Sequence, residues 1–279
     1  MSYIGTTKIG KMYLGNTEIA KAYLGNDLVF QKGGSPTPPP STYIQFADPN
    51  VEAVCVATWG DGVGITEAQA AAVPYDTPYN RNQFWNAFSS IISTITSFDE
   101  LRYFVNVNEI PATKFSGNTV LTTIGLDNVA SIGASAFNGC TSLAMEIDVP
   151  NLLMSSSGQN NEFRSSGITK IKDIGNSQYL SDYFFANNCP GLTEVHLPAT
   201  LINVGRLNFT RCSNLTTVVC LATTPPAAGG RNFDTAATLK IYVPYSADHS
   251  ILNAYKAASG WADNANQIYE LNQDGTIPS

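Results

Sequence analysis

A short phrase that recurs at nearly constant spacing constrains this fold more than any other feature. Each copy places hydroxyl or amide side chains before a Leu or Ile, which leads into alternating apolar residues. The copies begin at Leu121, Leu143, Ile168, Leu192 and Leu215, so successive units are 22, 25, 24 and 23 residues apart. This period predicts a solenoid, in which each unit buries its apolar side against its neighbours. Such an array favours binding over catalysis.

An aromatic residue precedes the phrase in every unit. These aromatics are Phe115, Phe137, Phe163, Phe185 and Phe209. We expect each ring to fill the interior of one turn. Cys140, Cys189 and Cys212 occupy equivalent places in their units, which predicts stacked, buried free thiols and no disulfides among them.

The composition indicates a mainly β chain with short helices and many turns. Charged residues make up only 13% of the sequence, against the usual quarter, and Ser, Thr, Asn and Gly replace them. The net charge is −7 and no run of Lys or Arg exists, so a nucleic-acid partner is not expected.

No targeting or membrane segment is expected from the sequence. The first residues show no basic region followed by an apolar one, so they do not predict a secretory signal. No stretch approaches about 18 apolar residues, so membrane insertion is not expected either.

Residues 1–32 contain a second repeat, with a period of ten residues. Tyr3, Tyr13 and Tyr23 begin its copies, and Gly and Asn supply turn chemistry between apolar runs. This pattern predicts a small three-stranded β-meander, which buries too little surface to be stable alone. We expect it to dock on another chain or on a copy of itself; the alternative is a modest cap on the next domain. The predicted docking side chains are Tyr3, Ile9, Tyr13, Ile19, Tyr23 and Val29.

The remaining chain divides into four predicted segments. A Gly- and Pro-rich linker spans 33–41, a mixed capping module spans 42–112, the solenoid spans 113–245 and a C-terminal cap spans 246–279. Within the capping module we expect helices over 50–57, over 66–73 with Thr66 as the N-cap, and over 83–95. Residues 151–161 interrupt one unit and are predicted to form a protruding loop.

The units resemble the BspA-like leucine-rich repeat, whose consensus is roughly A-F-x-x-C-x-x-L-x-x-I-x-L-P. Residues 136–143 read Ala-Phe-Asn-Gly-Cys-Thr-Ser-Leu, and residues 189–198 read Cys-Pro-Gly-Leu-Thr-Glu-Val-His-Leu-Pro. The preceding module is similar to one found before such repeats in proteins of gut bacteria and their phages. The pattern Lys-Ile-x-Lys-x-Tyr-Leu-Gly-Asn-Thr at 8–17 resembles a segment common in structural proteins of phages of gut Bacteroidales. The resemblance implies a short leucine-rich-repeat solenoid in a virion fibre or decoration protein.

The turn at 59–67 lies where similar modules carry a calcium loop. A calcium loop of the EF-hand type needs oxygen ligands at positions 1, 3 and 5 and a bidentate acid at position 12. Only Asp61 and Glu67 are available here, and Gln69 cannot replace the bidentate acid. The sequence therefore favours a metal-free turn, with Asp61 and Glu67 as weak metal candidates.

Catalytic constellations are not evident. His196 and His249 have no nearby Cys or Asp partner in the sequence, so they do not make a zinc or nucleophile set. No P-loop and no Gly-x-Ser-x-Gly elbow occurs. We expect a non-enzymatic protein without a cofactor.

Aromatic and amide side chains cluster between 75 and 85. The predicted ligand surface consists of Tyr75, Tyr79, Arg81 and Trp85. Loop and core packing would explain these residues equally well.

Together the resemblances imply a phage structural protein that adheres to a host-surface glycan or protein. Residues 1–32 would bind other virion proteins, and the chain would form a homo-oligomer, taken as a trimer from the symmetry of viral fibres. The alternative is a bacterial cell-surface adhesin of the BspA type, for which the lack of a signal pattern is unfavourable.

Overall fold

The computed structural model divides the chain into two compact units, Met1–Ile44 and Gln45–Ser279. It describes residues 2–4, 7–9, 13–14, 17–18, 21–24, 27–31, 43–154, 161–185, 189–230, 232–233 and 238–279. The predicted linker at 33–41 and the centre of the predicted loop at 151–161 lie outside these residues. The fold is mainly β with a few short helices, as expected for a leucine-rich-repeat protein.

Antiparallel hairpins make up the described part of the first unit. Their strands are β1 (Ser2–Ile4), β2 (Thr7–Ile9), β3 (Tyr13–Leu14), β4 (Thr17–Glu18), β5 (Lys21–Leu24) and β6 (Asp27–Gln31). β1 pairs with β2, β3 with β4 and β5 with β6. The predicted three-stranded meander is therefore corrected, because each ten-residue repeat supplies a hairpin. The register explains this: Leu14 pairs with Thr17, which leaves two residues between the strands, the commonest hairpin spacing.

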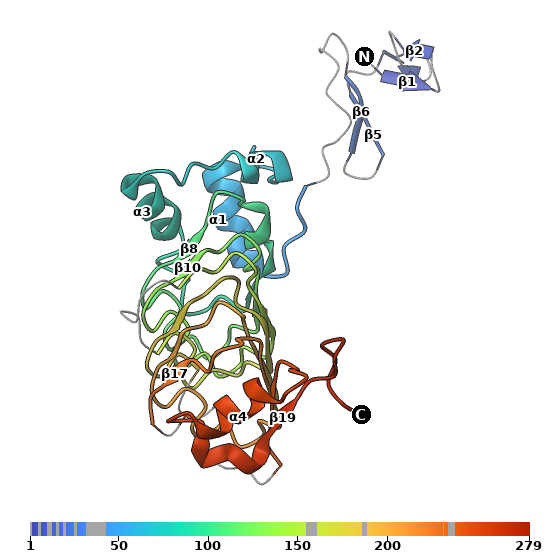
Figure 1. The fold of residues 1–279 in the computed structure, drawn as a ribbon. Helices are drawn as coiled ribbons and strands as arrows, with labels where there is room; N and C mark the ends of the chain where they lie inside the picture. Colours follow the sequence, from blue (N-terminus) through green and yellow to red (C-terminus); the bar gives the residue numbers. More distant parts are fainter. Residues whose placement is uncertain are drawn as a thin grey trace. The chain divides into compact units, whose positions relative to one another are not determined.

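Short helices lie together at the N-terminal end of the second unit (Figure 1). They are α1 (Pro49–Trp59), α2 (Glu67–Ala71) and α3 (Pro78–Ala87). Asp48 caps α1 by accepting hydrogen bonds from the Asn50 and Val51 amides. Thr66 caps α2 in a reciprocal capping box with Gln69. The first two predicted helices are confirmed to within two residues at each end.

The third helix begins and ends earlier than predicted. α3 starts at Pro78 and not at residue 83, because Thr77 accepts a hydrogen bond from the Asn80 amide and Pro78 takes the first helical turn. Proline suits that position, since its missing N–H has no partner there and its φ is already helical. Isolated turns follow Ala87 where the prediction continued the helix to residue 95.

A six-stranded parallel sheet forms one side of the second unit. In order, its strands are β11 (Glu146–Asp148), β12 (Lys170–Asp173), β14 (Glu194–Leu197), β16 (Thr217–Cys220), β18 (Lys240–Val243) and β19 (Ile268–Glu270). Paired residues in the first five strands are 23 to 25 positions apart. Each repeat therefore contributes one strand, and consecutive repeats lie next to each other.

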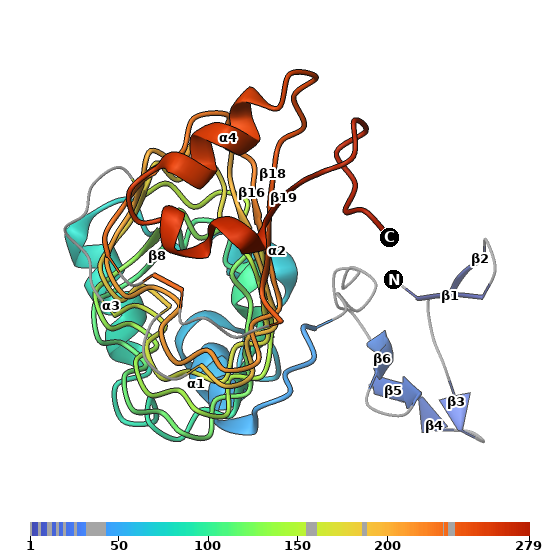
Figure 2. The same ribbon diagram turned by 60° about the horizontal axis from the view of Figure 1, so that its bottom comes forward.

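Shorter parallel strands complete the repeats. β7 (Ser97–Phe98) pairs with β9 (Thr123–Ile124), and β8 (Glu109–Ile110) pairs with β10 (Ser131–Ile132). β13 (Tyr179–Leu180), β15 (Asn203–Val204) and β17 (Ala227–Ala228) form a three-stranded sheet. The one-turn helix η1 (Asp99–Tyr103) follows β7. The strands β8 and β17 lie across the unit from β19, so each repeat runs from one side to the other (Figures 1 and 2).

A column of stacked phenylalanine rings runs through the interior. Successive ring centroids from Phe115 through Phe137, Phe163, Phe185 and Phe209 to Phe233 are 5.5, 5.1, 6.1, 5.8 and 5.3 Å apart. All of these rings are buried, which confirms the interior position predicted for the first five. The column ends on tryptophans: Trp85 meets Phe115 edge-on at 5.9 Å, and Trp261 meets Phe233 at 5.5 Å. Both ends of the repeat core are thus sealed by a large ring.

Left-handed backbone lies before the phenylalanine rings from Phe115 to Phe209, and after those rings whose following residues the structure describes. The residues two places before the rings, Thr113, Ser135, Asn161, Tyr183 and Leu207, have φ between 57° and 66°. Two places after the rings, φ is also positive at Gly117, Gly139, Ser165 and Arg211. Glycine adopts this conformation freely, whereas other residues are strained in it. Burial of the ring therefore holds each corner in a conformation that most of its residues disfavour.

The predicted free thiols are confirmed. Cys140, Cys189 and Cys212 are buried and form no disulfide. The Cys140 thiol donates to the Phe115 carbonyl at 3.0 Å, which ties one repeat to the repeat before it. In the first repeat Asn118 takes the same place, and its amide donates to the Ile92 and Ile95 carbonyls at 2.9 Å. An amide is needed there because two carbonyls of the capping module face it.

The C-terminal end is covered by α4 (Ser250–Ala257) and η2 (Ala262–Gln267), which precede β19 (Figure 2). Tyr255 donates its hydroxyl to the Ala222 carbonyl at 2.7 Å. The Trp261 indole donates to the Pro226 carbonyl at 2.9 Å. Both rings are buried, so the cap fastens to the last repeats through aromatic side chains whose polar atoms are satisfied.

Candidate functional site

Two of the four predicted ligand-surface residues are core residues. Tyr75 is 3% exposed and Trp85 is 2% exposed. The Trp85 indole donates to the Tyr75 hydroxyl at 2.7 Å, and that hydroxyl donates to the Glu109 carbonyl at 3.1 Å. Burial raises the pKa of Tyr75 to about 12. The predicted ligand contact is therefore corrected for these two residues: both side chains are buried, and the Trp85 ring closes the end of the phenylalanine column.

The other two residues of that set reach solvent. Tyr79 is 70% exposed. Arg81 pairs with the Glu109 carboxylate at 3.3 Å, donates to the Tyr75 carbonyl at 3.3 Å and lies over the Tyr75 ring at 5.7 Å. Arg81 is thus held in one place at the surface, with its guanidinium partly open to solvent.

Two hollows flank the Arg81 side chain. The larger, of about 470 Å³, is also lined by Asp76, Val105, Asn106 and Asn108. The smaller, of about 230 Å³, lies between α3 and the segment after β8, and is lined by Pro78, Asn82, Trp85, Asn86, Pro111 and Lys114 among others. We call the smaller one the Lys114 hollow. Asn82 belongs to the cluster of aromatic and amide side chains predicted at 75–85, whereas Asn86 was missed. Its spacing of four residues from Asn82 on one helix was the available signal.

The weak metal candidates do not come together at the 59–67 turn. One carboxylate oxygen of Asp61 accepts hydrogen bonds from the Val63 and Gly64 amides at 2.9 and 3.0 Å. Glu67 lies exposed in the first turn of α2, and the Gln69 amide group is engaged in the capping box. These contacts account for the turn without an ion. Among the described residues, no group of three or more His, Cys, Asp or Glu side chains could hold a metal ion.

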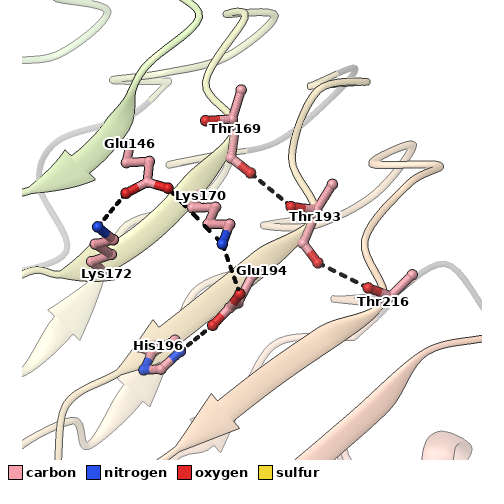
Figure 3. A network of polar contacts seen from close by, with 8 residues as sticks. All are labelled: Glu146, Thr169, Lys170, Lys172, Thr193, Glu194, His196 and Thr216. Carbon is pink, nitrogen blue, oxygen red and sulfur yellow. Dashed lines mark hydrogen bonds and ion pairs between the residues drawn. The ribbon is translucent and has the colours of Figure 1, made fainter.

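Charged side chains form a network on the outer face of the six-stranded sheet (Figure 3). Lys170 lies 3.9 Å from Glu146 and 3.3 Å from Glu194, and Lys172 also pairs with Glu146. His196 contacts Glu194 at 2.7 Å. The hydrogen bond from His196, with a smaller contribution from Lys170, lowers the pKa of Glu194. The network alternates in sign and satisfies its own charges.

The same outer face becomes apolar toward the C-terminus. Val219 and Tyr242 are register partners on neighbouring strands, and their chain neighbours Val218 and Ile241 are also buried. Alternation places Val219 and Tyr242 on the side opposite the interior. They nevertheless pack with Leu271 as a buried cluster. The outer face of the sheet therefore carries partly exposed charges at β11 to β14 and a buried apolar cluster at β16 to β19.

Both histidines have carboxylate partners that sequence reasoning missed. His196 pairs with Glu194 two residues earlier, and the His249 Nδ1 atom lies 2.6 Å from Glu270. The first partner follows from alternation, since residues two apart share one face of a strand. The second depends on the packing of the C-terminal cap against β19.

Glu162 is a buried carboxyl group that the sequence did not single out. It is fully buried, and the Ser181 hydroxyl lies 3.2 and 3.0 Å from its two oxygens. Burial raises the pKa of Glu162 to about 7, and the Ser181 hydrogen bond offsets only part of that effect. The position before the stacked rings holds Asn208 and Asn232 in later repeats, and both of these are buried with hydrogen bonds.

The predicted docking residues fall in the N-terminal unit, where only the backbone is described. Tyr3, Ile9, Tyr13, Tyr23 and Val29 lie in the hairpin strands. Ile19 lies outside the described residues. Their docking role stays a prediction.

None of the described helices is long and apolar enough to cross a membrane.

No curated protein matches the chain. Residues 86–224 match the family model described as BspA type Leucine rich repeat region, in six copies. The matched residues include the phenylalanine column from Phe115 to Phe209 and the strands β7 to β16. Residues 86–224 are thus a BspA-type leucine-rich repeat region, which indicates an adhesive or surface-binding function.

Proposed function

We propose that this chain is a non-enzymatic structural protein of a phage particle, a fibre or a decoration protein, which displays a short leucine-rich-repeat solenoid for adhesion to the host surface. The BspA-type repeats at 86–224 support the adhesive part of this proposal. The phage part rests on the sequence pattern at residues 8–17. Parallel strands from successive repeats lie side by side. At β11 to β14 their outer face carries partly exposed charged side chains, which are available to a glycan or protein ligand.

The hairpins of residues 1–32 are the proposed attachment to the particle. A two-stranded hairpin is at best marginally stable alone, and the six described strands pair only two by two. Further strands from other virion proteins, or from copies of the same chain, would stabilise them. A homotrimer is the proposed assembly.

The first test is whether the protein is part of a particle. Mass spectrometry of particles purified from an infected culture should detect the chain at a constant ratio to the capsid protein. Its absence from the particles would overturn the virion role. Deletion of residues 1–32 should abolish incorporation, while a deletion confined to residues 272–279 should preserve it.

The second candidate function is a bacterial cell-surface adhesin, which the same repeats favour. Surface labelling of intact, uninfected cells with an antibody against the chain separates the two functions. Labelling of uninfected cells supports the adhesin, whereas a signal that appears only with particles supports the virion protein.

A further inference from the structure

Lys114 carries a charge that no carboxylate of the described residues neutralises. Its ammonium group lies 5.7 Å from the centre of the Trp85 ring, and it belongs to none of the ion pairs among those residues. The carboxylate of Glu109, which also lines the Lys114 hollow, is engaged by Arg81 at 3.3 Å. Partial burial lowers the pKa of Lys114. An anionic group in the hollow would restore the stabilisation that the ammonium group has lost from water.

Two free amides face the same hollow. Asn82 and Asn86 are exposed on successive turns of α3, and within the described part of the chain their side chains form no hydrogen bond. Each amide offers a donor pair and an acceptor, which matches the hydroxyl groups of a sugar. Pro78 and Pro111 provide an apolar part of the lining of the Lys114 hollow.

The size of the hollow limits its ligand. Sites for drug-sized molecules have volumes of about 300–1,000 Å³, and the Lys114 hollow has about 230 Å³. It therefore has room for one small ring and not for a folded partner. The sheet face is a weaker candidate for an anion, because Lys170 and Lys172 already have carboxylate partners there.

We propose that the Lys114 hollow binds an acidic sugar, in which a ring carboxylate pairs with Lys114 and ring hydroxyls bond to Asn82 and Asn86. The proposal rests on the adhesive function and gives it a ligand class. A sugar fits better than an acidic peptide, because the hollow is small, is lined in part by prolines and offers paired amides rather than a row of cations.

The test is calorimetric titration of the full chain with an oligosaccharide that ends in glucuronic acid, and with the same oligosaccharide ending in glucose. The acidic ligand should bind, the neutral one should bind at least tenfold more weakly, and added salt should weaken the acidic ligand further. Lys114→Met keeps the packing on Trp85 but removes the charge. It should weaken binding by about tenfold or more. Lys240→Met removes an equal charge from the exposed side of β18 and should leave binding unchanged.

Equal binding of both oligosaccharides, equal effects of the two lysine variants, or binding of an Asp- and Glu-rich peptide in place of the sugar would overturn the proposal. If Lys114→Met fails to fold, Asn82→Ala with Asn86→Ala decides the matter, because both residues are exposed; unchanged binding would again overturn it. Binding is measured on the purified chain, so its failure leaves the particle experiment unaffected.

Discussion

The phenylalanine column and the outer face of the six-stranded sheet are built from the same repeats but held by different forces. The rings of the column are buried, and each packs against the ring of the next repeat. The outer face at β11 to β14 carries partly exposed charges that pair with one another. Burial of large rings is worth several kcal/mol per residue, whereas exposed ion pairs contribute about 0–1 kcal/mol.

This difference shows which part of the repeat is free to change. The interior must keep its rings and its corners, because a cavity or a strained corner there lowers stability directly. The outer face can exchange its charges at little cost. Side chains that recognise a ligand can therefore vary on the outside while the stacking of the repeats remains.

The largest effect is expected from a cavity in the middle of the column. Phe163→Ala removes a ring that packs on Phe137 and Phe185, and it should lower the free energy of unfolding by about 3–5 kcal/mol. Urea denaturation measures this. Tyr79→Ala is the control, since that aromatic is 70% exposed, and it should change stability by no more than about 0.5 kcal/mol. Similar losses in both variants would break the distinction between interior and surface.

The buried carboxyl group of Glu162 should make the stability of the protein depend on pH. Its folded pKa of about 7 lies above the ordinary 4.5, so the folded state holds the proton more tightly than the unfolded state. Stability should therefore fall as the pH rises from about 4.5 to 7 and level off above. Glu162→Gln should be more stable than the natural chain by roughly 3 kcal/mol at pH 8 and about equal at pH 4. Thermal denaturation of both chains from pH 4 to pH 8 measures this difference. If the stabilities of the natural chain and of Glu162→Gln changed with pH in parallel, ionisation of Glu162 would cost the folded state little, and the prediction would be wrong.

A substitution that strains the backbone at a phenylalanine corner should change the free energy of unfolding by less than the two interior substitutions above. Gly139 has φ of 76°, and an added Cβ would approach no atom closer than 3.7 Å. Gly139→Ala should therefore cost about 1 kcal/mol through its backbone conformation alone. Gly230→Ala is the matched control, because it has open space and no positive φ, and it should be neutral or slightly stabilising. Equal unfolding free energies for the two variants would mean that the corners are not strained.

The smallest effect is expected on the outer face. Glu194→Gln removes one partner each from Lys170 and His196, and it should change the free energy of unfolding by less than about 1 kcal/mol. The difference should shrink at high salt. Chemical denaturation at low and high ionic strength checks both points. A loss as large as that of Phe163→Ala would make the charged face a structural element.

Predictions from the sequence were correct where the repeat spacing determined the position of a residue. Phe115 to Phe209 and the thiols of Cys140, Cys189 and Cys212 could be placed in the interior because their spacing matches one or two turns of the array. The third helix was misplaced because the prediction did not use the cap at Thr77 and the proline at 78, which set its first turn. The meander was misjudged because a ten-residue period fits one strand or one hairpin per repeat, and only the pairing register distinguishes them.

The candidate site could be predicted only in part. Tyr75, Tyr79, Arg81 and Trp85 are close in sequence, and their residue types suit recognition equally. The structure turns Tyr75 and Trp85 into the core and leaves Tyr79 and Arg81 outside. Lys114 joins this region only because the segment after β8 packs beside α3.

By itself the sequence determined the repeat class, the ring at the centre of each turn and the ten-residue period of the N-terminus, because periodic patterns record which side of a local element is buried. Tertiary structure alone decided that Trp85 seals the column, that Glu162 is buried beside Ser181 and that Lys114 lies without a carboxylate partner among the described residues. Burial and charge pairing depend on which distant segment covers a side chain, and no local pattern contains that information.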